Sequence, residues 1–305
     1  MRPASTCIYY HPEAYTTSGP KLMGRNAAGE SFLKGFLKYT QPSNFLSVQV
    51  ESNEHAEHFT ATARKAGRSE QIRSYSRQNL IGLKEAGVMY LPGPAIGEHA
   101  FHRRLYGDAS WSLSGITHTT SSAVAMDAIT ELLTAPVKPW DSLICTSTAV
   151  KQNVEAILQA QTDYLQERLG ISKLPLPLLP VIPLGINTEE FTFSNKQKAG
   201  ARKNLGLRDE DLVVLYAGRL SFHAKAHPLP MYLGLEIAAK KTKKNVVLIE
   251  SGWHANPQIA DAFAEAANIA CPSVRIINVD GREEAGRRNA WASADVFCSL
   301  SDNIQ

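Results

Sequence analysis

Residues 211–252 read DLVVLYAGRLSFHAKAHPLPMYLGLEIAAKKTKKNVVLIESG, and this stretch decides the fold. It begins and ends with a continuous apolar run, DLVVLYAG (211–218) and NVVLIESG (245–252). Continuous runs, in place of alternating ones, are typical of strands that are covered on both faces. Between them, PMYLGLEIAAKK (230–241) places apolar residues three and four apart, as one buried helix face requires. Strand, helix and strand at this spacing predict a right-handed crossover in a parallel sheet.

The same alternation continues toward the end of the chain. Two further apolar runs predict strands, VRIINV (274–279) and DVFCSL (295–300). Two helices are expected before them, at 257–270 and 283–294, and Pro257 suits the first helical turn of its helix. The second half of the chain is therefore predicted to be an α/β domain with a parallel sheet.

The first half repeats the pattern less regularly. Short apolar runs predict strands at CIYYH (7–11), GVMYLPG (87–93), SLSGITHT (112–119) and SLICTS (142–147). Helical periodicity is found at 31–40, 149–158 and 161–169, and in the first of these Phe32, Leu33, Phe36 and Leu37 are expected to face inward. We predict a second α/β domain here.

A proline-rich stretch, KLPLPLLPVIPLGIN (173–187), separates the two halves. It cannot be a helix, because proline lacks the amide hydrogen and clashes with the preceding turn. We interpret its last part as a hinge between domains 1–186 and 187–305, which suits a chain of 305 residues.

Composition narrows the class of protein. The net charge of +3 gives no electrostatic case for nucleic acid, and no apolar run is long enough to cross a membrane. Each of the four cysteines lies in or beside an apolar segment, without a CxxC spacing, so buried reduced thiols are expected. A cytoplasmic protein fits this pattern best.

The loop after the first predicted strand, TTSGPKLMGRNAAGESF (16–32), is a candidate phosphate site. Gly19, Gly24 and Gly29 would let backbone amides approach a bound group beside a helix N-terminus. The spacing matches neither GxGxxG nor the P-loop, and an ordinary strand–helix turn explains it equally well.

GITH (115–118) ends a predicted strand, which places His118 at the carboxyl edge of the sheet. Ligands bind at that edge in open α/β sheets. The alternative is a core or capping histidine; the hydroxyl-rich run 117–122 favours a wet cleft or a helix start instead.

AGRLSFHAKAHP (217–228) follows the first strand of the second domain and carries Arg219 and Lys225 in one loop. Two such cations can neutralise a diphosphate, although a solvated basic loop is the simpler alternative. Metal binding by His223 and His227 is disfavoured, because their spacing needs a helix and Pro228 follows directly. No metal site is predicted.

Five stretches in order resemble the retaining glycosyltransferases of family 4, which have the GT-B fold. They are the glycine-bearing loop, GITH (115–118), DSLICTS with AVKQNV, VIPLGIN with Phe191, and VLYAGRLSFHAK. The fourth resembles the family's I-P-x-G-[VI]-[DN] segment, and the fifth resembles its G-R-L…K donor loop. The resemblance implies two Rossmann-like domains facing across a cleft, the first on the acceptor side and the second binding a nucleotide sugar.

The resemblance also implies roles for single residues. Gly218, Arg219 and Lys225 would hold the donor diphosphate, and the loop around Gly19 would approach it. His118 would be catalytic, lining the cleft near the transferred sugar. The stretch from Val279 to Gly281 would pass near the nucleotide base.

Two departures from the family pattern stand out. Between Arg219 and Lys225 this chain has LSFHA, where an acidic spacing is commoner. The chain also stops at SLSDNIQ (299–305), where the family's E-x(7)-E motif would begin, so an incomplete second domain is expected.

The expected function is transfer of a hexose-type sugar from a nucleotide-diphosphate sugar, with retention and without a metal or cofactor. The acceptor, whether a sugar, a lipid-linked group or a small molecule, is not specified by the sequence. The main alternative is a non-catalytic nucleotide-sugar-binding or scaffolding fragment without the acidic motif. A GT-B relative that isomerises or phosphorolyses sugars is another alternative, whereas an NAD-dependent oxidoreductase is disfavoured by the missing GxGxxG.

Overall fold

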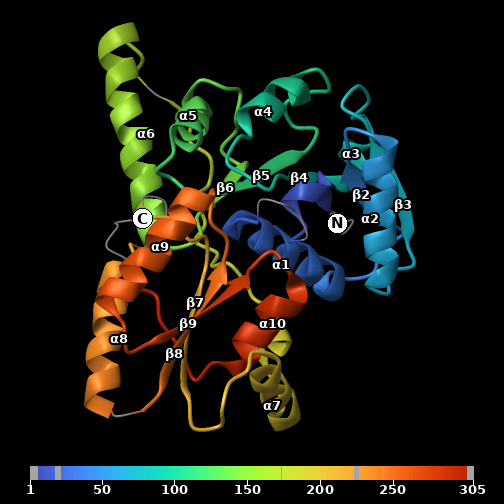
Figure 1. Ribbon diagram of the computed structural model, residues 1–305. Coiled ribbons are helices and arrows are strands. Elements are labelled where there is room, and N and C mark those ends of the chain that lie inside the picture. Colours follow the sequence, from blue (N-terminus) through green and yellow to red (C-terminus); the bar gives the residue numbers. More distant parts are fainter. Residues whose placement is uncertain (1–5, 18–21, 173, 223–226, 243, 301–305) are drawn as a thin grey trace. The chain divides into compact units, whose positions relative to one another are not determined.

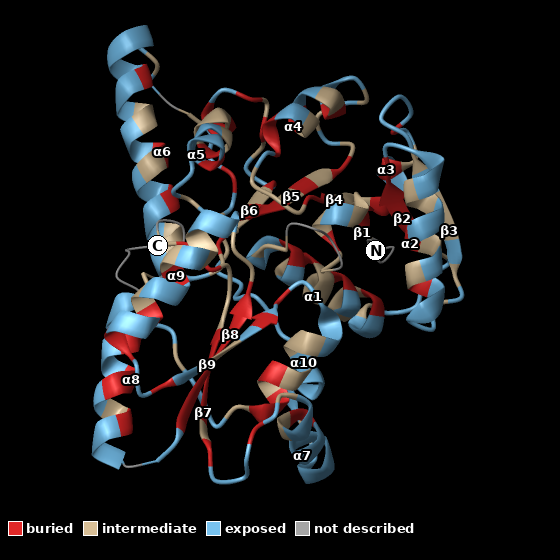
Figure 2. Ribbon diagram, viewed as in Figure 1, coloured by how far each residue is buried: buried red, intermediate tan, exposed pale blue. Residues whose placement is uncertain are grey.

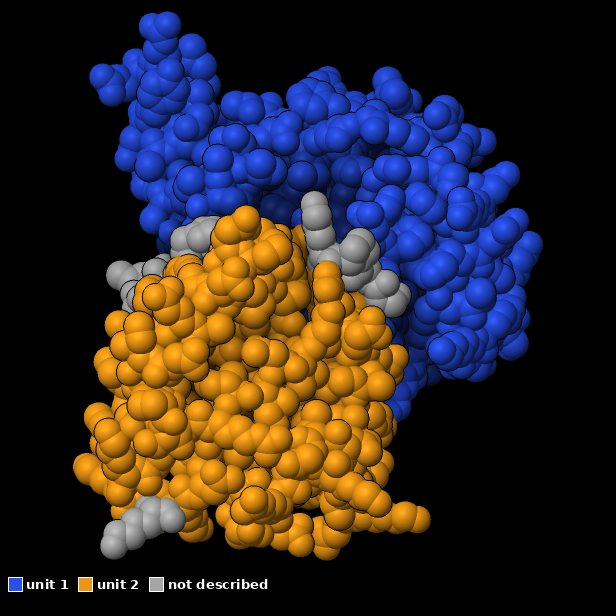
Figure 3. Space-filling view, in the orientation of Figure 1, with its two compact units in different colours: residues 1–16, 24–186 blue, residues 17–23, 187–305 orange. Residues whose placement is uncertain are grey.

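The computed structural model describes residues 6–17, 22–172, 174–222, 227–242 and 244–300. The chain divides into two compact units, unit 1 with residues 1–16 and 24–186 and unit 2 with residues 17–23 and 187–305 (Figure 3). Each unit is built on its own parallel sheet. Among the described residues, no helix combines the length and the apolar character that crossing a membrane demands.

Unit 1 contains six parallel strands in the order β3-β2-β1-β4-β5-β6 (Figure 1). Their bounds are β1 (Thr6–Tyr9), β2 (Phe45–Gln49), β3 (Gln71–Tyr75), β4 (Val88–Tyr90), β5 (Ser112–Ile116) and β6 (Ser142–Ile144). The described helices are η1 (Pro12–Ala14), α1 (Gly24–Tyr39), α2 (Asn53–Lys65), α3 (Leu83–Ala86), α4 (Gly97–Arg104), α5 (Ala123–Thr130), η2 (Glu131–Leu133) and α6 (Thr148–Leu169). This strand order is that of the doubly wound Rossmann sheet.

Two apolar cores cover the two faces of this sheet. Cys7 and Ile8 are consecutive and fully buried, yet they belong to different cores, because successive side chains of a strand point to opposite faces. Serine side chains start three of the helices: Ser52, Ser122 and Ser147 each accept a hydrogen bond from the amide three residues later. The inner strands are therefore covered on both sides, as Figure 2 shows by the buried residues along them, whereas the edge strand β3 has no buried residue.

Unit 2 contains four parallel strands in the order β10-β7-β8-β9. Their bounds are β7 (Leu212–Ala217), β8 (Val246–Gly252), β9 (Arg275–Asp280) and β10 (Val296–Phe297). The described helices are η3 (Thr188–Phe191), α7 (Asn195–Asn204), α8 (Leu229–Thr242), α9 (Pro257–Ala270) and α10 (Glu284–Ser293). Helices α8 and α9 pack on one face of the sheet and α7 and α10 lie along the other (Figure 1). Every residue of β8 is buried.

The proline-rich stretch forms part of the sheet edge in unit 1. Leu178 and Val181 make isolated parallel bridges with Ser142 and Cys145. Four backbone hydrogen bonds of 2.8–3.0 Å accompany the two bridges, the last from the amide of Ile182 to the carbonyl of Cys145. The division into units falls a few residues later, between positions 186 and 187.

A buried ion pair joins α4 to the start of β6 in unit 1. Arg103 and Asp141 are both fully buried, and the guanidinium donates to both carboxylate oxygens at 2.6 and 2.8 Å. Arg103 also donates to the carbonyls of Trp111 and Pro136, at 2.9 and 3.3 Å. The carboxylate accepts from the amides of Leu113 and Lys138, each at 2.8 Å. Bidentate geometry of this kind makes a strong charge-assisted contact.

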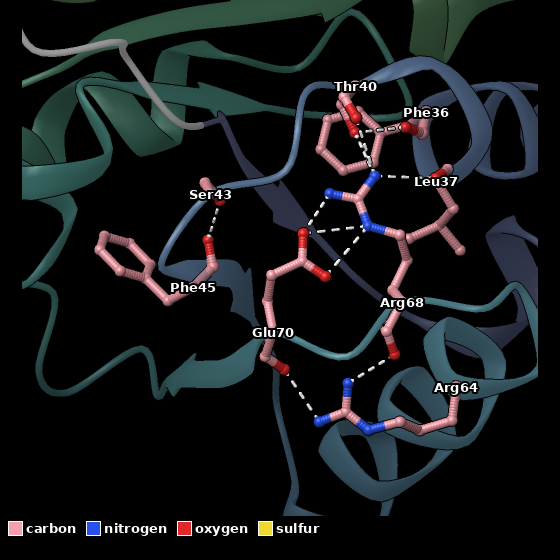
Figure 4. Close-up of polar contacts among 8 residues, drawn as sticks. All are labelled: Phe36, Leu37, Thr40, Ser43, Phe45, Arg64, Arg68 and Glu70. Carbon is pink, nitrogen blue, oxygen red and sulfur yellow. Dashed lines mark hydrogen bonds and ion pairs between the residues drawn. The ribbon is translucent and has the colours of Figure 1, made fainter.

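A second guanidinium ties α1 to β3 (Figure 4). Arg68 donates to the carbonyls of Leu37 and Thr40, at 2.8 and 2.9 Å, and so satisfies the end of α1. Nε and Nη2 of Arg68 donate hydrogen bonds to the carboxylate of Glu70. The side chains of Arg68 and Glu70 are each 9% exposed. The hydrogen bond from Arg68 is the main reason that the pKa of Glu70 falls from 4.5 to about 2.

Most predicted elements are confirmed, with corrections at their bounds. The α/β class and both parallel sheets are as expected. The two helical stretches at 149–158 and 161–169 form one helix, α6, and Phe32 and Phe36 are only partly buried. Cys7, Cys145 and Cys271 are buried free thiols, whereas Cys298 is half-buried.

Candidate nucleotide site

Each sheet has one point at which the strand order reverses. In unit 1 this point lies between β1 and β4, and in unit 2 it lies between β7 and β10. Chain segments leave the carboxyl ends of the two central strands in opposite directions there, which opens the crevice that binds ligands in such folds. The loop after β7, with Gly218 and Arg219, starts at this point in unit 2.

Three glycines pack backbone against backbone at the carboxyl ends of β7, β8 and β9. Gly218 has a φ of 156°, in the region that favours glycine. A side chain at Gly252 would collide with the carbonyl oxygen of Gly218, and one at Gly281 would lie 2.9 Å from the Cα of Gly252. The sequence predicted roles for Gly218 and Gly281 but missed Gly252, whose only signal was its place at the end of an apolar run.

A pocket of about 500 Å³ lies at the carboxyl ends of β8 and β9, against the first turn of α9. Its apolar walls come from Leu220, Pro257 and Ala260. Its polar lining includes Glu250 and Asn278. Concave sites with apolar walls and a few convergent polar groups are the usual form of small-molecule sites.

Glu250 is the most deeply buried polar group of this pocket, at 2% exposure. The hydroxyl of Tyr232 donates to its Oε1 at 2.6 Å. Burial raises the pKa of Glu250, while this hydrogen bond acts in the opposite direction. Sequence reasoning missed Glu250, although a single carboxylate inside a strand predicted to be covered on both faces should have marked it.

The rim of the pocket does not favour an anion. Nη2 of Arg282 donates to Oδ2 of Asp280 at 2.7 Å, and this contact lowers the pKa of the aspartate. Asn256 caps α9 with its own side chain, which accepts from the amide of Ile259 at 2.9 Å. Because the rim cation is paired and the helix end is capped, the pocket suits an uncharged part of a ligand.

His254, at the same pocket, adds a polar group that lacks a partner. Its Nε2 is buried without a hydrogen-bond partner among the described residues, and its ring lies edge-on to Phe263 at 5.2 Å. Burial lowers its pKa, so the imidazole is neutral near pH 7. A ligand could satisfy this nitrogen.

Arg219 lies in the loop after β7, at the order-reversing point of the sheet. It is half-buried, and its Nε has no hydrogen-bond partner within the described part of the chain. The next residue, Leu220, makes an isolated bridge with His254 and lines the pocket. A guanidinium in a loop whose next residue lines a pocket suits a ligand with an anionic group joined to a larger neutral one.

His118 lies in unit 1, two residues after β5, as predicted. Its Nδ1 is buried and no described residue hydrogen-bonds to it. Burial lowers the pKa of His118; a hydrogen bond to the backbone of Pro92 acts in the opposite direction, and the charge of Arg25 lowers the pKa further. The imidazole is therefore neutral near pH 7 and able to accept or donate a hydrogen bond.

The other predicted site residues have mixed outcomes. Gly19 and Lys225 fall outside the described residues, so their roles stay predictions. Val279 lies inside β9, not after it; its buried side chain packs in the apolar core, and the residue also lines the pocket. The residue that follows the strand is Gly281, whose amide donates to the carbonyl of Gly252 at 2.8 Å.

No group of three or more metal-ligating side chains is positioned for a metal ion among the residues that the structure describes. That nucleotide binding needs no metal stays a prediction.

No family model and no curated protein matches the chain. Solved structures do resemble it. Anabaena HepE in complex with UDP superposes with a TM-score of 0.58 at 12% identity, over 98% of this chain and 74% of that chain. Its complex with UDP-glucose gives 0.58 at 13% identity, over 97% and 74%. The N-terminal domain of Candida albicans trehalose-6-phosphate phosphatase gives 0.53 at 10% identity, over 98% and 77%.

These likenesses, together with the two parallel sheets, give the class of fold. The chain has the α/β architecture of the GT-B glycosyltransferases. At identities of 10–13% the likeness concerns the fold.

Proposed function

We propose that this protein is a glycosyltransferase that binds a nucleoside-diphosphate sugar in unit 2 and transfers its sugar to an acceptor. The observation that carries the proposal is the 500 Å³ pocket at the carboxyl edge of a Rossmann-ordered sheet, lined by Leu220, the residue that follows Arg219. Such a sheet edge is where nucleotides bind in folds of this kind. HepE, which has a similar fold, was solved with UDP and with UDP-glucose, and this supports the choice of ligand.

The parts of the site suit the parts of such a donor. The partly apolar pocket takes the nucleoside. Arg219 takes the diphosphate, on which negative charge grows as the sugar leaves. A fixed cation at that position stabilises the transition state more than the ground state, and such electrostatic terms are usually the largest in catalysis.

The finer parts of the proposal go beyond the fold. We assign the transfer to a hexosyltransferase-type reaction with retention, as in the family 4 enzymes that the sequence resembles. His118 acts in the transfer step and Lys225 assists Arg219 at the diphosphate, without a required metal. The free thiols support a cytoplasmic location.

A pocket-filling variant tests the location of the nucleotide. Ala260 lines the pocket, whereas Ala264 is exposed one turn further along α9. We expect Ala260→Phe to weaken UDP-glucose binding at least tenfold in isothermal titration, and Ala264→Phe to leave it unchanged. Equal effects of the two substitutions would contradict the assigned site.

An activity measurement separates catalysis from binding alone. Incubation with uridine, guanosine and adenosine diphosphate sugars and a panel of acceptors should release a nucleoside diphosphate from one of the donors. Tight binding of a donor without release or transfer would favour the alternative, a non-catalytic nucleotide-sugar-binding protein. Failure to bind any of the donors would remove the proposed function.

A further inference from the structure

Two floor residues of the pocket in unit 2 belong to a row of side chains across three strands. Glu250 of β8 pairs in register with Tyr216 of β7 and with Asn278 of β9. Register partners in a parallel sheet point to the same face, with strands about 4.8 Å apart. The carboxylate of Glu250 and the carboxamide of Asn278 are thus neighbours on the floor, and both line the pocket.

Tyr232 fixes the orientation of the Glu250 carboxylate. Burial is the main cause of a raised pKa for Tyr232, so its hydroxyl stays protonated and acts as the donor in the 2.6 Å contact. That length lies in the usual range of an O–H···O hydrogen bond. Oε1 therefore already accepts a hydrogen bond from a residue of α8.

The second carboxylate oxygen, Oε2, can accept a hydrogen bond from a ligand in the pocket. Within the described part of the chain, no residue donates a hydrogen bond to Oε2 and no lysine or arginine pairs with Glu250. A buried carboxylate oxygen of this kind gains most from a ligand that brings an N–H or O–H donor. It repels a phosphate.

We propose that Glu250 anchors the base of the bound nucleotide by accepting an N–H of the heterocycle at Oε2. Asn278 lies beside it and contacts the neighbouring edge of the base. The proposal rests on the function proposed above and adds the group that holds the nucleoside. Leu220, Pro257 and Ala260 add apolar walls, against which the ring of a base can pack.

A ligand pair tests the contact from the nucleotide side. In UDP the base is attached to ribose through N1 and keeps a single N–H, at N3, so UDP and N3-methyl-UDP differ in the donor that Glu250 would accept. We expect wild-type protein to bind N3-methyl-UDP at least tenfold more weakly than UDP in isothermal titration, and 2′-deoxy-UDP nearly as well as UDP. A loss with 2′-deoxy-UDP and none with N3-methyl-UDP would assign Glu250 to the ribose and overturn the proposal.

Glu250→Gln tests the contact from the protein side. Because Tyr232 donates, it keeps the amide oxygen of Gln on its own side and turns the NH₂ group toward the pocket. A base N–H would then face another donor, so UDP binding should fall tenfold or more, while pyrophosphate, which has no base, should bind unchanged.

Glu236→Gln is the matched control. Glu236 is a buried glutamate of the same unit that accepts two hydrogen bonds from Ser273 at 2.9 Å and does not line the pocket. This variant should leave UDP and pyrophosphate binding unchanged. Circular dichroism and thermal melting establish that each variant is folded.

A double substitution distinguishes an anchoring role from a structural one. In Tyr232→Phe/Glu250→Gln nothing holds the amide oxygen on the α8 side, so the amide can rotate and present its oxygen to the base. We expect the double variant to bind UDP at least threefold more tightly than Glu250→Gln alone, although it lacks one more hydrogen bond.

Two results would overturn the proposal. One is folded Glu250→Gln protein that binds UDP as the wild type does. The other is a double variant that binds UDP more weakly than the single variant. Wild-type protein that binds neither UDP nor any other nucleoside diphosphate would remove the proposed function itself, and the anchoring role with it.

Discussion

Replacing Gly252 by alanine should push the loop that carries Arg219 away from β8. The added methyl group would collide with the carbonyl oxygen of Gly218 and lie 3.0 Å from Cγ of Leu220. Backbone atoms cannot rotate out of the way as a side chain end can, so the loop must move by about 1 Å to restore ordinary contact distances. Gly252 does not have a positive φ, so the strain comes from the collision alone.

The size of the effect follows from the contacts that hold the loop. Two hydrogen bonds join it to the chain at the end of β8, from the amide of Gly218 to the carbonyl of Ser251 at 3.0 Å and from Leu220 to Trp253 at 3.1 Å. Each contributes about 0.5–1.5 kcal/mol, and overpacking in a tight site costs about 1–3 kcal/mol. We expect the free energy of unfolding to fall by about 1–3 kcal/mol. Displacement of the Arg219 guanidinium should weaken UDP-glucose binding by about 10-fold to 100-fold.

Urea unfolding and isothermal titration measure the two effects on the same preparation. Gly234→Ala is the matched control, because Gly234 lies exposed in α8 and an added methyl group meets nothing within 4 Å. That change should stabilise the protein by about 0.5–1 kcal/mol, as alanine does in helices, and leave binding unchanged. If Gly252→Ala behaves like this control, the backbone contact between the glycines does not position the loop.

Three further predictions concern single side chains. Arg219→Ala should weaken nucleoside diphosphate binding by about 1.5–3 kcal/mol, because a charge-assisted contact is lost. EDTA should not abolish binding to the wild-type protein, and titration with and without the chelator measures this. His118→Ala should lower turnover about 10-fold to 1,000-fold with little change in nucleotide affinity; a lower melting temperature with normal turnover would instead identify a core histidine. Glu70 has a lowered pKa of about 2, so its contact with Arg68 stabilises the fold fully above pH 4.5 and loses this effect as the pH falls toward 2. Urea unfolding between pH 6 and pH 3 should show that Glu70→Gln removes part of this acid sensitivity, and an unchanged profile would exclude the contact as a source of stability.

The sequence allowed the central strands to be predicted better than the peripheral ones. In unit 2, β7 and β8 are continuous apolar runs because both faces are covered, and such runs are easy to recognise. In unit 1, β2 and β3 were missed. β3 is an edge strand with the sequence QIRSY and no buried residue, so its pattern does not differ from that of a polar loop.

The candidate site was predictable only in part. His118 and Arg219 each follow a strand. Because ligands bind at the carboxyl ends of strands in open α/β sheets, both positions could be predicted from the sequence. Glu250 and Asn278 are 28 residues apart and meet only through the register of β8 and β9, which hydrophobic periodicity does not determine. The glycine contacts at Gly252 likewise depend on how two backbones approach each other.

The buried pair of Arg103 and Asp141 limits how this part of the protein can change during evolution. Many buried ion pairs can be exchanged for apolar residues of similar volume without loss of stability. Here the two side chains also serve four backbone groups, the carbonyls of Trp111 and Pro136 and the amides of Leu113 and Lys138. An apolar replacement would remove the partners of all four, and the two that lie in the interior, at Trp111 and Leu113, would cost about 1–3 kcal/mol each. Replacing either residue alone would leave the other charge unpaired in the interior and severely destabilise the protein. Both positions should therefore stay unchanged while the surrounding apolar residues vary.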